Sequence, residues 1–201
     1  MKKTTIIILI LILAIAAIVF SQMRNNGGEA DTPSLSSESS EAESKAALEK
    51  IIKSPERAAV SAAVAETDLT ETYVNEAYRF SIKYPAKLNV SSFESADGSG
   101  YVILIADLQT GYGVQIFISP YADSSDVTAE RIRQDVPGIT IKNPQEVLLG
   151  QTGKGVAFTD GTGVTANRQV WFASKGQLYQ LTAPMDFDDT LRRMLDTWIF
   201  M

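Results

Sequence analysis

Residues 102–118 read VILIADLQTGYGVQIFI, which is two apolar runs separated by a glycine-rich turn. Both runs, 102–106 and 114–118, are apolar on the two faces that a strand presents, which is typical of strands inside a sheet covered on both sides. The turn TGYG at 110–113 is too short for a parallel crossover, which needs a dozen residues or more. The stretch therefore predicts an antiparallel hairpin in the middle of a covered sheet.

The same pattern continues on either side of this hairpin. A third run that is apolar on both faces lies at 170–173, and further glycine turns lie at 97–100, 160–163 and 175–176. At 78–84, aromatic and apolar residues alternate with polar ones and Pro85 follows, which is typical of an edge or near-edge strand with one wet face. We expect a largely antiparallel sheet of about six or seven strands.

Two helices are predicted beside the sheet. The first begins near Asp126 and ends before Pro137, and the second closes the chain with an apolar stripe from Phe187 to Ile199 that faces the sheet. In the second helix, Asp188 and Asp189 precede Arg192 and Arg193 by four residues, the spacing of ion pairs on a helix. The expected fold class is α/β, more closely α+β, with the sheet sandwiched between helices.

The strand at 78–85, YRFSIKYP, and the strand at 178–184, LYQLTAP, followed by a helix that ends in Trp198-Ile199-Phe200, resemble the opening and the close of PsbP-like domains. The resemblance covers residues 69–201, and it implies an antiparallel sheet between helical layers. Plant members of the family help photosystem II to retain its inorganic ions, a fungal member binds a small GTPase, and many bacterial members are exported. The resemblance transfers no functional residue to this chain, which lacks histidine.

The N-terminus predicts export and an anchor. Lys2 and Lys3 precede an uncharged apolar run at 6–20, the arrangement of a signal anchor whose lysines stay in the cytoplasm. With its uncharged flanks the segment extends from Thr4 to Ser21, about 18 residues, and is roughly 27 Å long as a helix, against a hydrocarbon core of about 30 Å. We therefore expect residues 1–23 to form a single-pass anchor with the soluble domain outside the cytoplasm. The alternatives are a cleaved signal, with cleavage near Ser21 and a secreted or periplasmic product, and a buried core helix.

Residues 24–68 are predicted to be a Ser-, Glu- and Ala-rich linker with short helices. Its first half has too few large apolar side chains to fold by itself. Ser54-Pro55-Glu56 then gives an N-cap, a proline at the first helical position and an acid in the first turn of a helix that extends to Glu66. These helices either cover the domain or mediate self-association.

Composition excludes several classes of function. The formal net charge is −6, which argues against nucleic acid as a partner. Without cysteine and histidine there is no thiol nucleophile, thiolate metal site or Ser-His-Asp triad, so we assign no catalytic, cofactor or metal residue. The glycines around Lys154 lack the spacing of a phosphate loop and predict a turn. We predict that Asp186 caps the last helix, and that Asp188 and Asp189 form ion pairs with Arg192 and Arg193. This arrangement is preferred over a calcium site.

Two tyrosines are candidate ligand-facing residues. Tyr112 lies between Gly111 and Gly113, and Tyr121 follows Pro120, so turns could present both rings to a ligand. The alternative is that both rings pack back on the sheet.

The leading functional hypothesis is a membrane-tethered, extracytoplasmic and non-catalytic binding or assembly module, with an envelope protein as the expected partner. The alternatives are a carboxylate-dependent extracytoplasmic hydrolase and a self-associating structural protein of the envelope. The sequence determines neither the ligand nor the oligomeric state.

Overall fold

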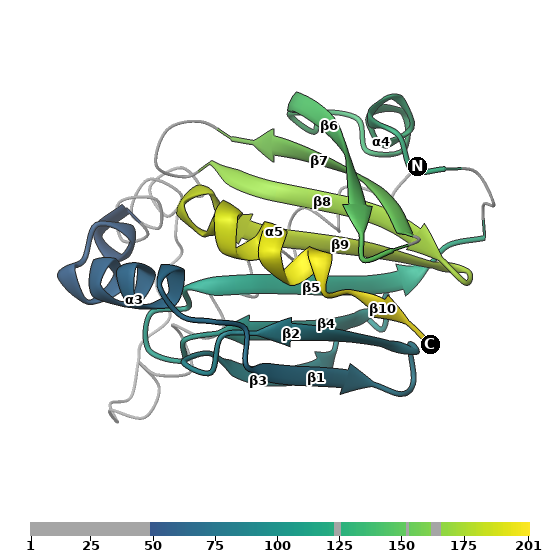
Figure 1. Cartoon of the computed structure of the whole chain (residues 1–201). Coiled ribbons are helices and arrows are strands. Elements are labelled where there is room, and N and C mark those ends of the chain that lie inside the picture. The colour runs from purple at the N-terminus through teal and green to yellow at the C-terminus, as the bar shows by residue number, and fades with distance from the viewer. Residues whose placement is uncertain (1–48, 123–125, 152, 162–165) are drawn as a thin grey trace, which may run out of the picture.

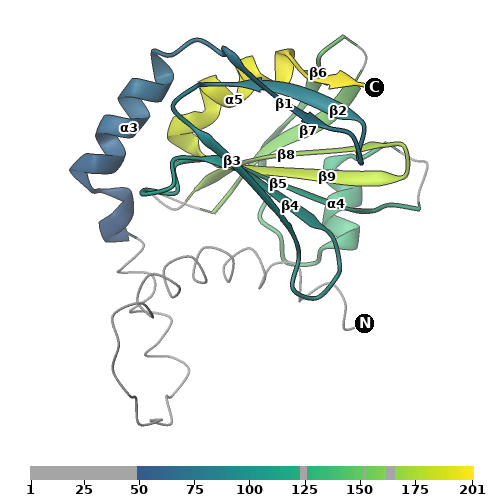
Figure 2. The same cartoon turned by 90° about the horizontal axis from the view of Figure 1, so that it is seen from below.

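The computed structural model describes residues 49–122, 126–151, 153–161 and 166–201. They form three layers (Figures 1 and 2). A seven-stranded sheet is the middle layer, with helices and a small sheet on one face and a short helix on the other. The predicted anchor, 1–23, and the first half of the predicted linker lie outside the described residues. Among the described helices, none is both long and apolar enough to cross a membrane.

The seven-stranded sheet is antiparallel throughout, as predicted. Its order is β3-β4-β5-β9-β8-β7-β6, so the three runs predicted to lie inside the sheet are all inner strands. The strands are β3 (Asn89–Glu94), β4 (Tyr101–Ala106), β5 (Gly113–Pro120), β6 (Lys142–Leu149), β7 (Gly153–Asp160), β8 (Asn167–Ser174) and β9 (Gln177–Pro184).

A second sheet of three strands was not predicted. It consists of β1 (Glu71–Asn75), β2 (Phe80–Tyr84) and β10 (Ile199–Phe200), in the order β1-β2-β10. The alternation at 78–84 correctly predicted one buried face, since Phe80 and Ile82 are fully buried. Of the two predicted positions, edge or near-edge, the edge is wrong, because β2 lies between the outer strands β1 and β10.

The last helix ends earlier than predicted, and the reason lies in Thr197. After the short helix η2 (Met185–Phe187), α5 covers Asp188–Asp196. The Thr197 hydroxyl donates to Met194 O (2.7 Å) and accepts from Lys83 N (2.9 Å), so the chain leaves the helix beside β2. Ile199 and Phe200 then pair with Ser81 and Phe80 in β10.

The main core lies between the two sheets, and aromatic rings fill its centre. Trp198 stacks on Phe80 with ring centroids 4.4 Å apart, and Phe172 stacks on Tyr179 at 4.8 Å. The apolar stripe of α5, which includes Leu191 and Met194, is fully buried against the same cluster. This stripe confirms the face predicted for the last helix.

The other face of the large sheet carries a smaller core. Helix α4 (Ala129–Asp135) begins one turn later than expected, because Thr128 is the N-cap and its hydroxyl accepts from Arg131 N (3.2 Å). Ile132 of this helix packs against Val156, Phe158 and Trp171. The large sheet is therefore covered on both faces at β7 and β8.

Helix α3 (Pro55–Ala65) belongs to the folded unit, which therefore begins ahead of Leu69. Ser54 caps it as predicted, accepting from Arg57 N at 3.2 Å. Val64 is fully buried, and Arg57 is 8% exposed. The Arg57 guanidinium lies 5.0 Å from the centroid of the Tyr112 ring and 3.4 Å from Asp186.

Arg57→Ala is expected to release α3 while the sheets stay folded. The change removes a cation–π contact and a partly exposed ion pair, together about 1.5 kcal/mol, which corresponds to a rise of about tenfold in amide exchange along 55–65. Hydrogen exchange followed by mass spectrometry measures this, with Lys53→Ala as the exposed control. Unchanged amide exchange in α3, or an equal rise in β8, would contradict the prediction that Arg57 holds α3 against the rest of the fold.

Candidate functional site

Tyr112 is buried, which corrects its prediction as a solvent-presented ring and agrees with the alternative that the ring packs back on the sheet. Its side chain is 1% exposed, and its hydroxyl donates to Asp186 O (2.9 Å) and accepts from the Ser61 hydroxyl (2.8 Å). The ring meets Phe187 edge to face at 5.4 Å. The glycine turn folds the ring back over the sheet, and burial raises the pKa of the Tyr112 hydroxyl. Tyr112 therefore joins α3 to η2.

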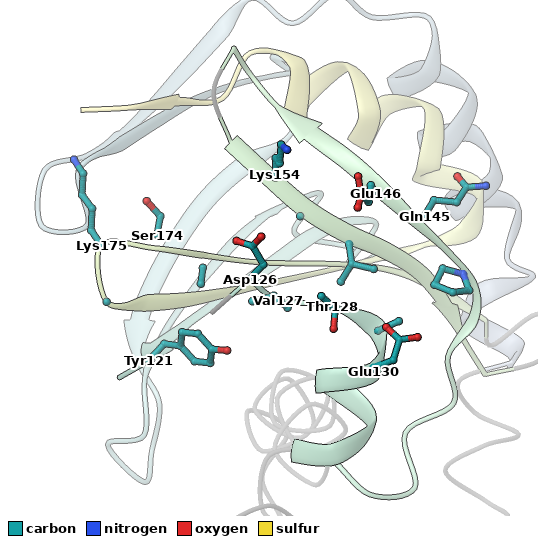
Figure 3. Close-up of a pocket in the computed structure, with 16 residues that line it drawn as sticks. Tyr121, Asp126, Val127, Thr128, Glu130, Gln145, Glu146, Lys154, Ser174 and Lys175 are labelled. Atoms are coloured by element: carbon teal, nitrogen blue, oxygen red, sulfur yellow. The ribbon is translucent and has the colours of Figure 1, made fainter. Parts of the chain in front are cut away.

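Tyr121 lies at the wall of a groove of about 580 Å³. The groove runs between the segment that leads into α4 and the strands β6 and β7, and the β8–β9 turn closes one end (Figure 3). Its lining residues are Tyr121, Asp126, Val127, Thr128, Ala129, Glu130, Pro144, Gln145, Glu146, Lys154, Gly155, Val156, Ala173, Ser174, Lys175 and Gly176.

Local sequence explains the shape of this groove. Lys175 and Gly176 both have positive φ (50° and 76°) in the tight β8–β9 turn, and Gly176 O accepts from Tyr121 N at 2.8 Å. Ala173 lies on the same face of β8 as Trp171, beside α4, and its small side chain lets the groove keep its depth there. A larger side chain at Ala173 would fill the groove.

Charges of both signs line the groove. Lys154 and Glu146 project from β7 and β6, and Asp126 projects from the opposite wall (Figure 3). The carboxylates of Asp126, Glu130 and Glu146 belong to exposed residues. The Tyr121 hydroxyl is shielded from water and has no hydrogen-bond partner in the part of the chain that the structure describes. It is thus a buried polar group of the groove wall that lacks a partner among the described residues.

A buried polar network lies on the same face of the sheet. Gln169 is 4% exposed, and its amide donates to Asp160 Oδ2 (2.6 Å) while its carbonyl accepts from Trp171 Nε1 (3.2 Å) and Thr182 Oγ1 (2.9 Å). Desolvation by burial raises the pKa of the Asp160 carboxyl, and the hydrogen bonds from Gln169 and Asn167 partly offset that rise. The network is satisfied internally, so it holds the sheet together.

Two of the three aspartates at positions 186, 188 and 189 form ion pairs. Asp188 accepts from Arg168 (2.8 Å) and from Arg192 (3.1 Å), which confirms the predicted pair with Arg192. Asp186 does not cap the helix as predicted, because the helix has no side-chain cap and Asp186 pairs with Arg57. No cluster of three metal-ligating side chains occurs among the described residues.

The segment around Lys154 is a hairpin turn, as predicted. Gly150 has φ 56° and its N–H donates to Leu195 O at 2.9 Å, so the turn between β6 and β7 is attached to the end of α5. Lys154 itself is the second residue of strand β7, where a phosphate loop would continue into a helix.

Among solved structures, the chain is similar to cyanobacterial PsbP (CyanoP) from Synechocystis sp. PCC 6803, determined in solution. The TM-score is 0.43 at 11% identity, and the match covers 65% of this chain and 92% of that chain. That protein belongs to the family that the sequence resembles. No protein-family model matches the chain, and no curated protein matches it. The similarity concerns the path of the chain, and no ligand or activity follows from it.

Proposed function

We propose that this chain is a non-catalytic binding module that is held at the outer face of a membrane by residues 1–23. The module binds a protein of the cell envelope in the groove beside α4. The groove is the observation that carries the proposal. Its volume of about 580 Å³ is in the range of ligand sites, roughly 300 to 1,000 Å³. The lysine pair at 2–3 and the apolar run at 6–20 support the tether.

The charges of the groove favour a protein partner. Lys154 and Lys175 would attract carboxylates, while Asp126, Glu130 and Glu146 would attract cations. A protein surface of mixed charge complements such a lining, whereas the carboxylates would repel a uniformly anionic polymer. The groove therefore suits a folded or extended polypeptide.

The hydrolase hypothesis has less support. A carboxyl that acts as general acid needs a dry surrounding to keep its proton near neutral pH. Asp126, Glu130 and Glu146 are the groove's carboxylates, and all three belong to exposed residues. Asp160 is shielded, but both of its oxygens accept hydrogen bonds from Gln169 and Asn167.

A photo-crosslinking amino acid at position 146 tests the proposal in cells that express the full chain. We expect an adduct from position 146 and none from position 76, an exposed site on the turn between β1 and β2. The adduct should stay with membranes through an alkaline wash, because the tether is a spanning helix. Ala173→Trp, which fills the floor of the groove, should reduce the adduct at least tenfold.

A second variant distinguishes loss of binding from loss of the fold as the cause of a reduced adduct. Lys154→Glu changes an exposed groove residue without adding volume to the floor, and it should also reduce the adduct. Lys53→Glu, an exposed charge reversal ahead of α3, should leave the adduct unchanged. Equal adducts from 146 and 76, or an adduct that resists both groove variants, would refute the site.

A further inference from the structure

We propose that two copies of this chain pair through strand β3, antiparallel about a two-fold axis at Ser92, so that the large sheet continues from one copy into the other. Strand β3 is one outer strand of the seven-stranded sheet, and β6 is the other (Figure 1). Every residue of β3 is exposed except Val90, which is half-buried.

The two outer strands differ in how they are protected against pairing. Strand β6 has a bulge between Lys142 and Gln145, a proline at 144 and a positive φ of 49° at Asn143. These features interrupt an edge and keep another strand from adding to it. Strand β3 pairs with β4 in unbroken register and contains neither proline nor lysine. It is the edge of this sheet that a further strand can extend.

The backbone of β3 directs alternate residues outward. Ser95 N donates to Gly100 O at 2.8 Å, which places Ser95 in a hydrogen-bonded pair with the β4 side. Hydrogen-bonded pairs alternate along an antiparallel ladder. The N–H and C=O groups of Val90, Ser92 and Glu94 therefore point away from β4, where an added strand would bind them.

Symmetry and the outward backbone groups select the register. An axis normal to the sheet pairs residues of the same face, and an axis at Ser92 places Val90 opposite Glu94 of the second copy. The outward backbone groups of all three residues, Val90, Ser92 and Glu94, then face those of the second copy.

Neighbouring registers lose this match. An axis at Ser91 leaves Glu94 opposite Leu88, which lies outside β3. An axis at Glu94 sets the two Glu94 carboxylates against each other, which is destabilising when like charges are directly opposite. In the Ser92 register all three outward residues of β3 face outward residues of the second copy.

Phe93 provides the apolar part of the interface. It is 44% exposed and lies opposite Val102 at the end of a row on the α4 face of the sheet. In the proposed pair it lies opposite Ser91 of the second copy and diagonal to the second Phe93. Diagonal neighbours are about 7–8 Å apart, within reach of aromatic rings. Pairing would thus cover an aromatic side chain that one copy leaves partly in water.

The chain contains no cysteine, so a disulfide between two copies can form only through a cysteine that is introduced. Ser92→Cys in the full chain, oxidised in its own membranes, should give a disulfide-linked dimer on a non-reducing gel. Directly opposite Cα atoms in a hydrogen-bonded pair are about 5.5 Å apart, within the range that a disulfide spans. The substitution removes two interactions of the Ser92 hydroxyl, the hydrogen bond that it accepts from the Tyr101 hydroxyl and its hydrogen bond with the Tyr73 hydroxyl.

Ser91→Cys is the matched control for the register. Its two copies would lie diagonally across the axis at more than about 7 Å, too far for a disulfide. We expect at least tenfold less dimer from Ser91→Cys than from Ser92→Cys. Equal yields, a higher yield from Ser91→Cys, or no dimer from either would overturn the proposal.

A lysine at position 92, on the proposed two-fold axis, gives an independent test of the oligomeric state. Ser92→Lys sets two cations opposite each other and should shift the detergent-solubilised chain from dimer to monomer in sedimentation. Leu148→Lys makes the same addition on the exposed opposite edge, and should leave the dimer intact. A monomeric parent chain, or a dimer that survives Ser92→Lys, would refute pairing through β3. The groove beside α4 plays no part in this pairing, so either proposal can fail alone.

Discussion

Gly150→Ala is expected to lower the free energy of unfolding by about 3 kcal/mol or more, the largest effect of any single methyl group that we predict. A Cβ at this position would lie 1.9 Å from Trp198 O, which is backbone and cannot rotate away. The φ of 56° adds the strain of a left-handed conformation. The shift required would also break the bond from Gly150 N to Leu195 O. The β6–β7 turn would then separate from the end of α5.

Gly111→Ala is the control that isolates the steric part. Its φ of 66° is similar, but a Cβ there meets no atom within 4 Å. It should cost about 1 kcal/mol, the conformational strain alone. Urea unfolding of the full chain, followed by the fluorescence of the two tryptophans, measures both values. Equal losses from the two variants would show that Trp198 gives way to the added methyl group.

Sequence patterns predicted the hairpins of the large sheet because their signals are local. Within each hairpin a short glycine turn fixes the direction and the pairing of the two strands. The pairing of β5 with β9 joins two distant segments and has no such signal. The three-stranded sheet likewise depends on a contact between distant segments. Lys83 N and Thr197 Oγ1 meet across 114 residues, and neither residue carries a signal for the other. The two residues of β10 were therefore predicted as the end of a helix.

The groove was only partly predictable for a similar reason. Tyr121 was singled out by its place after Pro120, and the structure does place it on the groove wall. Lys154 and Ala173 come from two other strands, and only the sheet order brings them beside Tyr121. Tyr112 had the same signal as Tyr121 but is buried, since its hydroxyl binds Ser61 and the backbone of η2. A turn position alone does not separate a presented ring from a packed one.

Gln169 illustrates a polar residue whose role depends on its neighbours across the sheet. It lies opposite Thr182 on β9, beside the buried Trp171, and its amide reaches Asp160. Such a network has no signature in the local sequence, because a glutamine before an apolar run usually indicates a wet position. Knowing that β8 lies between β7 and β9 is what identifies it.

Gln169→Leu is expected to destabilise the fold by about 3 kcal/mol near neutral pH. The leucine matches the volume but leaves the Trp171 indole N–H buried without a partner and removes the strongest donor to Asp160, and each such loss costs about 1–3 kcal/mol. Thr182 loses its acceptor as well. Urea unfolding of the full chain measures the loss, with Thr182→Val as the control that removes one donor and should cost about 1 kcal/mol.

The pH dependence of that loss separates the effect on Asp160 from a packing defect. Burial raises the pKa of the Asp160 carboxyl above its ordinary value of 3.8, and the Gln169 hydrogen bond opposes the rise. A raised carboxyl pKa means that the folded state keeps a proton that the unfolded state has lost. The contribution to stability therefore falls as pH rises from 3.8 through the folded pKa, and it is level above that. Gln169→Leu removes the opposing hydrogen bond and moves the folded pKa higher, so the variant should lose more stability near pH 7 than near pH 4, whereas Thr182→Val should lose the same amount at both. A loss from Gln169→Leu that does not change with pH would mean that the amide fills space in the sheet without holding the Asp160 carboxylate.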